Sequence, residues 1–187
     1  MNLRRVRSKG GSIRGFAHRL STGKRPKSEL LMAMMVEEEQ RGILKPEIYR
    51  EFYQAIEQRK QLTLEYLDQA IAEGKTVAAY GASTTTTTLL YHFELGSRLS
   101  FIIDDNPIKQ GTFSPGLHIP VLPSSELKTR KPDVVVILAW MYANVIIDKN
   151  QEYIAQGGKF LVPLADVKVV GRETVVLTGE TMERTGT

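Results

Sequence analysis

Residues 76–91, TVAAYGASTTTTTLLY, decide the fold of this chain. The apolar run from Thr76 to Tyr80 has the length of a buried strand, and Gly81 ends it. We predict that residues 84–95 form a helix directly after this glycine. A strand, a glycine turn and a helix in this order indicate one βα unit of an α/β domain.

Three further apolar runs, at residues 99–103, 134–138 and 159–162, are predicted to be strands. A helix over residues 141–156 separates the last two. Short apolar strands that alternate with helices are typical of a parallel sheet covered on both faces. Because such crossovers are right-handed, we predict an α/β fold with a Rossmann-like, mainly parallel sheet of about four to five strands flanked by helices.

A long amphipathic helix precedes this sheet. Between Pro46 and Glu73 apolar side chains recur at three-to-four spacing, Pro46 suits a first helical turn and Gly74 ends the pattern. A shorter helix, rich in Met and Leu, is predicted from Glu29 to about Arg41, with Ser28 as its cap. Its apolar side chains suit packing in a core or in an interface between copies of the chain.

We divide the chain into three parts. Residues 1–26 are a basic arm, residues 27–171 are the Rossmann-like domain, and residues 172–187 are a polar, Thr-rich tail with a short strand near 174–177. Residues 105–123 form a long loop that holds four of the eight prolines. Long ordered loops in compact domains are more often functional than idle.

The net charge of +4 is concentrated in the arm. Residues 1–30 hold nine bases and one acid, a charge of +8, whereas the remaining residues hold 16 bases and 20 acids, a charge of −4. A basic arm can bind nucleic acid or acidic lipid, but no nucleic-acid-binding motif accompanies this one. A solvated arm or the edge of a further domain explains the charge better than nucleic-acid binding does.

Composition excludes several classes of protein. The 187 residues contain no cysteine, which excludes disulfides and thiolate metal sites. No apolar run has the length that spans a bilayer, and the N-terminus lacks the apolar core and cleavage site of a secretory signal. We predict a cytoplasmic protein that does not contact a membrane.

The first candidate binding site is the turn Gly81-Ala82-Ser83-Thr84. Backbone N–H groups at the start of a helix favour an anion, and small side chains let a ligand approach the backbone. Only one glycine is present, however, so a dinucleotide fingerprint is poorly supported. The alternative is a tight turn with a hydroxyl cap, and the threonines at 84–88 can likewise bond a ligand or bond back to the turn.

Two further candidates follow predicted strands. Asp104-Asp105-Asn106-Pro107 ends the second strand, where an acid holds a ribose in Rossmann domains, although Asx residues before proline also form simple turns. Trp140 and Met141 follow the third strand, where Trp140 could stack on a base or sugar or cap the core. No histidine or serine is placed as a metal ligand or catalytic group, so the sequence predicts a binding site and no catalytic one.

These residues together resemble a known family. They are Tyr80-Gly-Ala-Ser-Thr84, Thr88-Leu-Leu90, Asp104-Asp-Asn-Pro107, Lys109-Gln-Gly111, Ser114-Pro-Gly116, His118-Ile-Pro120, Leu138-Ala-Trp140, and Gly157-Gly158 with Phe160 and Val162-Pro163. In order and spacing, residues 27–171 resemble the C-terminal domain of the S-adenosylmethionine-dependent C-methyltransferases that act on nucleotide-linked deoxysugars. Gly10-Gly-Ser-Ile-Arg14 is similar to a segment near the end of that family's central domain.

The resemblance implies a layout and a function. Complete members carry a zinc domain, a domain that binds S-adenosylmethionine and holds the catalytic Tyr/His segment, and this Rossmann-like domain, with the sugar nucleotide between the last two. The first two are not recognisable here. We therefore expect a substrate-side domain that binds no S-adenosylmethionine and transfers no methyl group alone, and that acts with the missing methyltransferase domain in cis or trans.

The predicted substrate-binding residues are Gly81, Ala82, Ser83, Thr84, Asp104, Asn106, Lys109, Trp140 and Met141, with no catalytic or metal-binding residue. Relatives often have Lys-Gly-Asn where this chain has Thr85-Thr86-Thr87, which replaces a cation by hydroxyls. Three alternatives stay open: a stand-alone nucleotide- or sugar-binding module that acts with a separate methyltransferase subunit, a small oxidoreductase using a nicotinamide cofactor, and a nucleic-acid-binding arm. A homo-oligomer also stays open.

Overall fold

A computed structural model describes residues 2–6, 11–24 and 26–178. The chain divides into two compact units, residues 1–56 and residues 57–187. The long helix α2 (Pro46–Ala72) contributes its first turns to the first unit and the remainder to the second. Parts of the predicted arm (residues 1, 7–10 and 25) and of the predicted tail (residues 179–187) lie outside the described residues.

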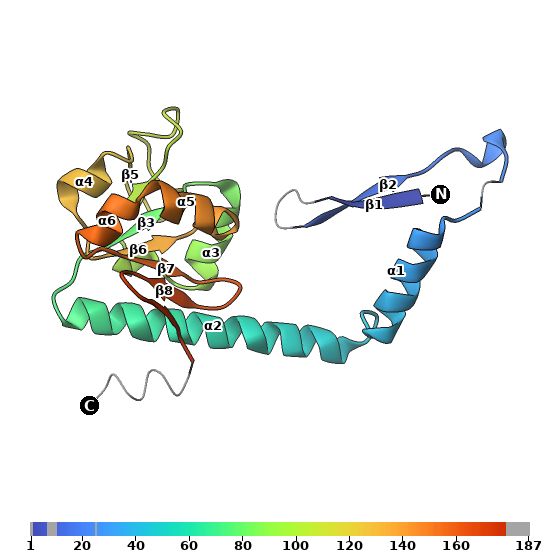
Figure 1. The fold of residues 1–187 in the computed structure, drawn as a ribbon, viewed down its shortest axis with the longest axis horizontal. Helices are drawn as coiled ribbons and strands as arrows, with labels where there is room; N and C mark the ends of the chain where they lie inside the picture. The colour runs from blue at the N-terminus through green and yellow to red at the C-terminus, as the bar shows by residue number, and fades with distance from the viewer. Residues whose placement is uncertain (1, 7–10, 25, 179–187) are drawn as a thin grey trace. The chain divides into compact units, whose positions relative to one another are not determined.

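The second unit is built on a seven-stranded sheet (Figure 1). The strands run in the order β5-β4-β3-β6-β7-β8-β9. Their bounds are β3 (Val77–Tyr80), β4 (Ile102–Ile103), β5 (Val121–Leu122), β6 (Val134–Ile137), β7 (Lys159–Val162), β8 (Lys168–Val170) and β9 (Thr174–Val176). Strands β3 to β7 are mutually parallel, whereas β8 pairs antiparallel with β7 and β9 pairs antiparallel with β8. The predicted α/β class with a mainly parallel sheet is confirmed.

The sheet has more strands than predicted. The short strand expected near 174–177 is present as β9, and it pairs with β8 in a hairpin that extends the sheet beyond β7. The two-residue strand β5 lies at the end of the predicted 105–123 loop, where Pro120 and Pro123 flank it and conceal its strand character. The second predicted strand is shorter than expected, since only Ile102 and Ile103 pair.

The strand order changes direction beside β3. From β3 the chain moves outward through β4 to β5, then crosses back to β6 on the other side of β3 and continues to β7. Neighbouring parallel strands that lead away in opposite directions leave their connections on opposite sides of the sheet. In open α/β sheets, ligands commonly bind near the carboxyl ends of the strands at such a point, here β3 and β6.

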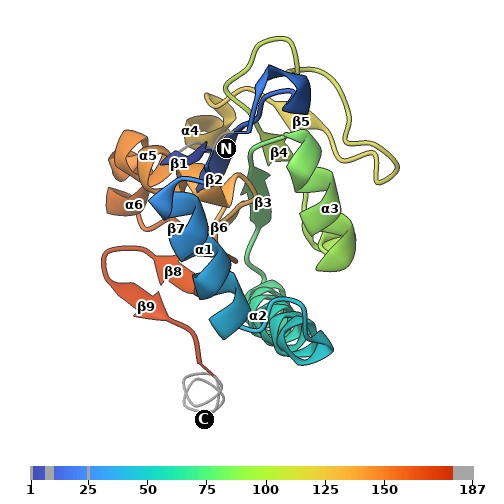
Figure 2. The ribbon, with the colours of Figure 1, turned by 90° about the vertical axis from the view of Figure 1, so that its right-hand side faces the viewer.

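Helices cover both faces of the sheet. Figure 2 shows α3 (Thr84–His92) on one side of β3, and α5 (Ala143–Lys149) and α6 (Gln151–Ala155) on the other. On the α5 side, Tyr80, Ile137, Ile146, Ile154 and Phe160 belong to one buried cluster. Two further short elements, α4 (Glu126–Arg130) and the 3₁₀ turn η3 (Gly96–Arg98), complete the connections.

The predicted helix 141–156 is interrupted. A 3₁₀ turn, η4 (Trp140–Tyr142), precedes α5, and Asn150 separates α5 from α6. The Asn150 side chain donates a hydrogen bond to the Ile146 carbonyl at 2.7 Å. An amide side chain that bonds the backbone in this way competes with the helical ladder, which explains the break.

The predicted helix at 46–73 is confirmed as α2. Within the second unit, Leu62, Leu67 and Ala70 are buried along one face of α2. Arg98 holds the solvent side of the same segment through a bidentate ion pair with Asp68, at 2.6 and 2.7 Å. Gly74 has a φ of +77°, the left-handed conformation in which helices commonly end.

The first unit contains a β-hairpin and helix α1. Strands β1 (Asn2–Val6) and β2 (Ser12–Phe16) are antiparallel, with Arg4 opposite Arg14, and η2 (Leu20–Thr22) follows. Helix α1 (Glu29–Gln40) begins at Ser28, whose hydroxyl accepts from the Leu31 N–H, as predicted. Sequence analysis did not predict the hairpin, because Leu3 is the only residue of its two strands that becomes buried.

None of the helices in the described part of the chain is long and apolar enough to cross a membrane.

Candidate functional site

The turn after β3 is closed against the neighbouring strand. Gly81 has a φ of +102°, and its backbone N–H donates to the Ile103 carbonyl at 2.7 Å. A Cβ at this position would lie 2.5 Å from the Cβ of Ala139, which follows β6. Glycine is therefore required for two reasons, a left-handed backbone and the close approach of β6. No space for a ligand is left directly between Gly81 and Ala139.

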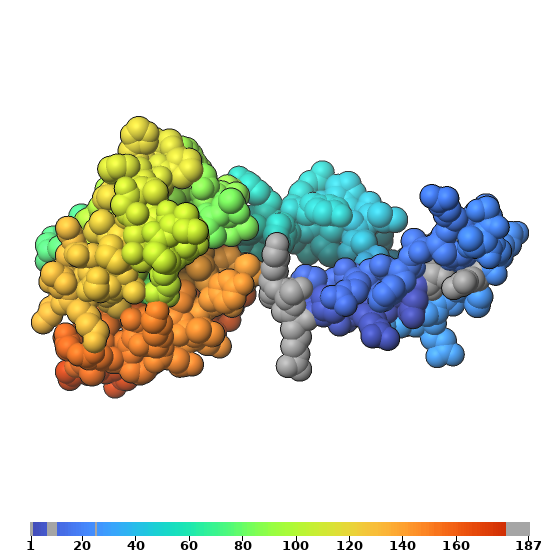
Figure 3. Space-filling view, turned by 90° about the horizontal axis from the view of Figure 1, so that it is seen from above, coloured from blue at the N-terminus to red at the C-terminus, as the bar shows by residue number. Residues whose placement is uncertain are grey.

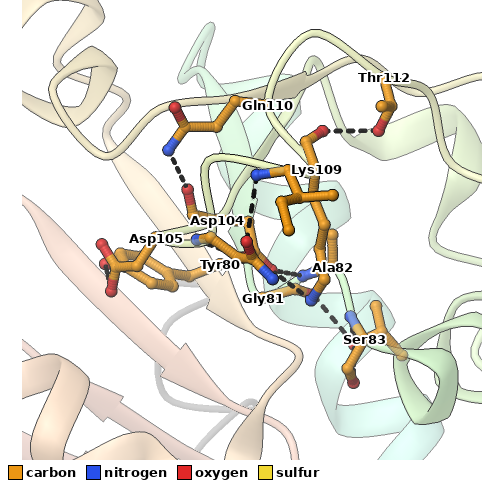
Figure 4. A network of polar contacts seen from close by, with 12 residues as sticks. Tyr80, Gly81, Ala82, Ser83, Asp104, Asp105, Lys109, Gln110 and Thr112 are labelled. Atoms are coloured by element: carbon orange, nitrogen blue, oxygen red, sulfur yellow. Dashed lines mark hydrogen bonds and ion pairs between the residues drawn. The ribbon is translucent and has the colours of Figure 1, made fainter.

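Asp104 fastens the next segment to this turn (Figure 4). Its Oδ2 accepts a hydrogen bond from the Ala82 N–H at 2.7 Å and lies 3.2 Å from the Lys109 ammonium, while its Oδ1 accepts from the Asn106 N–H at 2.8 Å. The residue is only 8 % exposed. Buried carboxylates are stable only when they are bonded in this way. Asp104 therefore joins the start of α3 to the root of the long loop.

Asp105 fastens the same loop to the other face of the sheet. The Tyr80 hydroxyl donates to its Oδ2 at 2.9 Å, and the Lys149 ammonium donates to its Oδ1 at 2.7 Å. Burial raises the pKa of Asp105, but the hydrogen bonds from Lys149, Tyr80 and Ser124 outweigh burial and hold that pKa below its ordinary value. Burial, followed by the Asp105 carboxylate, raises the pKa of Tyr80. Asp105 is thus a structural anion and not a proton donor at neutral pH.

The threonine run at the start of α3 has a structural role at Thr86. The buried Thr86 hydroxyl donates to the Gly81 carbonyl at 2.9 Å and accepts from the Ser83 N–H at 3.2 Å. Its neighbours Thr84 and Thr85 are exposed. A β-branched residue costs little in a first helical turn when its hydroxyl replaces a missing backbone bond. The prediction that these hydroxyls bond back to the turn is confirmed for Thr86.

The long loop is folded upon itself and is exposed on the surface of the second unit (Figure 3, yellow-green). Gly111 and Thr112 exchange backbone hydrogen bonds with Val121, both at 2.9 Å, and the Ser114 N–H donates to the Ile119 carbonyl at 2.8 Å. Phe113 and Pro120 form an isolated bridge between these bonds. The loop is therefore a hairpin-like arm with a fixed register, anchored at its root by Asp104 and Asp105.

A cavity of about 210 Å³ lies between this arm and the start of α3. The α3 side contributes Ala82, Ser83, Thr86, Thr87 and Leu90, the arm contributes Lys109, Thr112, Phe113, Ser114 and Pro115, and Ile102 and Val121 of the sheet complete the wall. Lys109 is the single charged residue of the lining. The cavity sits at the carboxyl edge of β3 and β4, where α/β sheets bind their ligands.

Comparison with known proteins decides the family. The model of the C-methyltransferase C-terminal domain matches residues 7–165. The chain is also 36 % identical, over 144 residues, to the C-methyltransferase NovU of Streptomyces niveus. The chain belongs to the C-methyltransferase C-terminal domain family. The matched stretch covers 76 % of this chain and 34 % of that relative, so the chain corresponds to about a third of the relative's length.

The whole cavity of this C-methyltransferase C-terminal domain lies inside the matched residues. The match also includes β2, α1 and α2, and it ends before β8. The resemblance to this family that the sequence analysis described is confirmed by the match. The hairpin of β8 and β9 lies beyond the matched residues and adds strands at the edge of the sheet, away from the cavity.

The predicted site residues fall into two groups. Ala82, Ser83 and Lys109 line the cavity. Gly81 and Asp104 lie behind its wall and hold the turn and the arm together. The four other predicted residues, Thr84, Asn106, Trp140 and Met141, are not part of the lining. Their ligand contacts stay predictions.

The geometry around Asn106 favours a structural role, and Trp140 lies outside the cavity lining. The Asn106 side chain accepts from the Ile108 N–H at 3.1 Å, the local turn expected of an Asx residue before proline. Trp140 lies in η4, the turn that follows β6, with 36 % of its surface exposed. Aromatic contact in the cavity comes instead from Phe113, which the sequence analysis did not select although it lies in the proline-rich loop.

Chemistry beyond binding is sparse in the described part of the chain. Across residues 2–6, 11–24 and 26–178, His, Asp and Glu side chains form no group of three that could hold a metal ion. His92 Nε2 lies 3.1 Å from Glu57 Oε1, a pair that links α3 to α2 and does not line the cavity. Sequence spacing cannot reveal such a pair, because 35 positions in the chain separate its members. The cavity itself offers a cation, hydroxyls and an aromatic ring.

Proposed function

We propose that this chain is the substrate-side domain of a C-methyltransferase that acts on a nucleotide-linked sugar, and that the cavity beside Lys109 holds part of this substrate. The observation that carries the proposal is the position of the cavity, at the carboxyl edge of a parallel sheet in a domain of the C-methyltransferase family. Numbered from β3, the parallel strands have the order 3-2-1-4-5, which supports a Rossmann-like fold.

Lys109 supplies the positive charge that the α3 turn lacks. The family resemblance implies a lysine at the position of Thr85, which does not line the cavity, whereas here the cation of the lining is Lys109 of the arm. Its ion pair with Asp104, at 3.2 Å, leaves further N–H donors on the ammonium for a ligand oxygen. A phosphate of the substrate is the oxygen-rich group that such a donor suits.

The residues of this turn do not fit S-adenosylmethionine. A cofactor at a Rossmann-type turn needs close access to the backbone beside the glycine. Ala139 packs against Gly81, and the Asp104 carboxylate takes the Ala82 N–H. We therefore propose that S-adenosylmethionine, which would supply the methyl group, binds in another domain of the complete enzyme. The same closed turn argues against a nicotinamide cofactor on this chain.

The first unit offers a surface for that other domain. Among its described residues, the exposed large apolar side chains are Ile13, Phe16, Leu20, Leu30, Met32, Met35, Val36, Leu44, Tyr49, Phe52 and Tyr53. Exposed apolar surface of this kind is typical of protein–protein contact. We propose that the methyltransferase domain covers it, either on the same polypeptide or as a separate subunit. The second arrangement makes this chain a stand-alone sugar-nucleotide-binding module.

Titration tests the substrate side of the proposal. Isothermal titration of the chain with a dTDP-linked 4-keto sugar should give saturable binding, and S-adenosylmethionine and NAD should give none. Lys109→Met should weaken that binding, because Lys109 is the single charged residue that lines the cavity. Lys128→Met is the matched control, since Lys128 pairs with Glu152 away from the cavity. Equal affinities for the Lys109→Met and Lys128→Met variants would contradict the assigned site.

Methyl transfer tests the catalytic part. The chain alone should transfer no methyl group from S-adenosylmethionine to the keto sugar. Addition of the complementary two thirds of a C-methyltransferase in trans should restore transfer, and Phe52→Glu should abolish the restoration if the first unit is the contact surface. Methylation by the chain alone would overturn the division of labour that we propose.

A further inference from the structure

The cavity is too small for a whole nucleotide-linked sugar. Its volume is about 210 Å³, whereas pockets that enclose ligands of drug size occupy roughly 300–1,000 Å³. One ring of the substrate can enter, and the rest must lie outside. The remaining question is which ring this is, the nucleobase or the sugar.

Two backbone N–H groups in the turn before α3 are not available to a phosphate. The Ala82 N–H donates to Asp104, and the Ser83 N–H donates to the Thr86 hydroxyl. A phosphate that binds at such a turn needs backbone N–H groups that are unoccupied. Lys109, on the arm side of the cavity, is the single charged residue of the lining and therefore the residue best suited to the anionic part of the substrate.

The inner wall of the cavity is mainly apolar. Leu90, Ile102 and Val121 are buried and close its inner end. Two of the hydroxyls in the lining are committed as donors, since Thr86 donates to the Gly81 carbonyl and Thr112 donates to the Lys109 carbonyl. A sugar ring with several hydroxyls would lose hydrogen bonds to water here without replacing most of them. A flat base loses far less.

Phe113 provides an aromatic face at the mouth of the cavity. Its ring lines the cavity and yet is 64 % exposed, while its backbone is held by the bridge to Pro120. The ring is also tilted against His118, with 6.5 Å between the ring centroids. An exposed ring on a fixed backbone is a ready surface for stacking, because little conformational freedom is lost when a base binds.

We infer that the cavity receives the nucleobase of the substrate, stacked on Phe113, with Lys109 against the adjoining phosphate. This inference rests on the proposed function, and it adds that Phe113 is the base-recognition residue. The sugar then points out of the cavity, where a second domain can reach it. A base carries no charge, so the cavity wall needs no charged residue other than Lys109, which faces the phosphate in this arrangement.

Isothermal titration of the full chain with dTDP, thymidine and inorganic pyrophosphate tests the inference. We expect dTDP to bind, pyrophosphate to bind far more weakly and thymidine to retain part of the affinity. Phe113→Ala should weaken dTDP binding about 5- to 150-fold, the range measured for base–aromatic stacking. Phe113→Tyr should retain it, and Lys109→Met should weaken dTDP without affecting thymidine.

Ile108→Ala is the matched control. Ile108 lies on the same arm and is 85 % exposed, but it does not line the cavity. We expect its affinity for dTDP to equal that of the wild-type chain. Circular dichroism of each variant checks that the fold is retained. We expect it to be retained, because the side chains of Phe113 and Ile108 are both exposed.

The outcomes separate the inference from the proposed function. If the dTDP-linked keto sugar binds and Phe113→Ala leaves its affinity unchanged, the base assignment is overturned and the proposed function stands. If dTDP binds through Phe113 but the dTDP-linked sugar does not bind, the base site stands and the proposed function is overturned. Equal affinities for pyrophosphate and dTDP would also overturn the base assignment.

Discussion

The Oδ2 atom of Asp104 lies 2.7 Å from the backbone nitrogen of Ala82, at the point where a Rossmann-type turn would otherwise present its N–H to a ligand. The chain thus satisfies its own turn with a buried carboxylate. The next residue, Asp105, bonds Tyr80 on the opposite face of the sheet. Two adjacent aspartates therefore fix the cavity arm from both sides.

Removal of the Asp104 carboxylate should loosen the arm. Asp104→Ala leaves the Ala82 and Asn106 N–H groups and the Lys109 ammonium without their shared acceptor. A buried donor left without a partner costs about 1–3 kcal/mol. We expect the free energy of unfolding, measured by urea titration, to fall by roughly this amount, and hydrogen exchange at Ala82 and Asn106 to accelerate.

Asp148→Ala is the control for Asp104→Ala, since Asp148 is exposed and has no ion pair within the described part of the chain. Its stability and its exchange rates should match those of the wild-type chain. Unchanged exchange at Ala82 in the Asp104→Ala protein would show that the carboxylate does not hold the turn.

Alanine at Gly81 should destabilise the domain by two additive effects. The backbone φ of +102° disfavours any side chain, and the new Cβ would lie 2.5 Å from the Ala139 Cβ. We expect Gly81→Ala to lower the free energy of unfolding by roughly 2–4 kcal/mol. Urea titration of the purified variant measures the loss.

Gly157→Ala separates the two effects at Gly81. Gly157 has nearly the same φ, +100°, but no atom lies within 4 Å of the point that a Cβ would occupy there. The loss in the free energy of unfolding for Gly157→Ala should therefore reflect the backbone conformation alone. It should be smaller than the loss for Gly81→Ala. The double variant Gly81→Ala with Ala139→Gly should recover part of the difference, because the Ala139 backbone N and Cα still lie 3.1 and 3.3 Å from the new Cβ. No recovery would mean that contact with the Ala139 Cβ is not the cause.

Much of the fold could be predicted from local sequence signals. The strand-turn-helix at residues 77–92 was predictable because a short apolar run, a glycine and capping hydroxyls agree. Strand β5 and the β1–β2 hairpin were not, because β5 has only two paired residues between prolines and the hairpin buries only Leu3. Such elements depend on partners distant in the sequence.

The candidate site was predictable only at its root. Ala82, Ser83 and Lys109 lie beside turn motifs that the sequence displays, and the structure brings them to one cavity. Phe113 was missed because no local pattern distinguishes a ring that lines a cavity from one exposed on a loop. Trp140 was selected for its position after β6, but the cavity lies between α3 and the arm, and Trp140 is not part of its lining.

A buried tyrosine offers a test of the core behind the site. The Tyr153 hydroxyl donates to the Pro132 carbonyl at 2.7 Å, and its ring packs edge-on against Phe160 with 5.0 Å between the ring centroids. Tyr153→Phe keeps the ring and removes the hydroxyl. We expect a loss of about 0.5–1.5 kcal/mol in the free energy of unfolding. Tyr142→Phe, at an exposed tyrosine, should change it by less than the error of the measurement; equal effects would contradict the role of the buried bond.

The Asp133 carboxylate should make folding stability depend on pH. Its Oδ2 accepts hydrogen bonds from the backbone N–H and the hydroxyl of Thr76, both at 2.8 Å, where β3 and β6 begin. These bonds, the backbone one first, lower the pKa of Asp133. The folded chain therefore binds this proton more weakly than the unfolded chain does, and stability falls as the carboxylate is protonated.

The sign of this effect fixes the expected pH profile. The contribution of Asp133 is fully present above the pKa of an unfolded aspartate, about 3.9, and it is lost as the pH falls through the lower pKa of the folded chain. Asp133→Asn should therefore be less stable than the wild-type chain at neutral pH, and urea titrations from about pH 5 to pH 3 should show this gap narrowing. A gap of constant size across that range would mean that the carboxylate of Asp133 carries no linked proton.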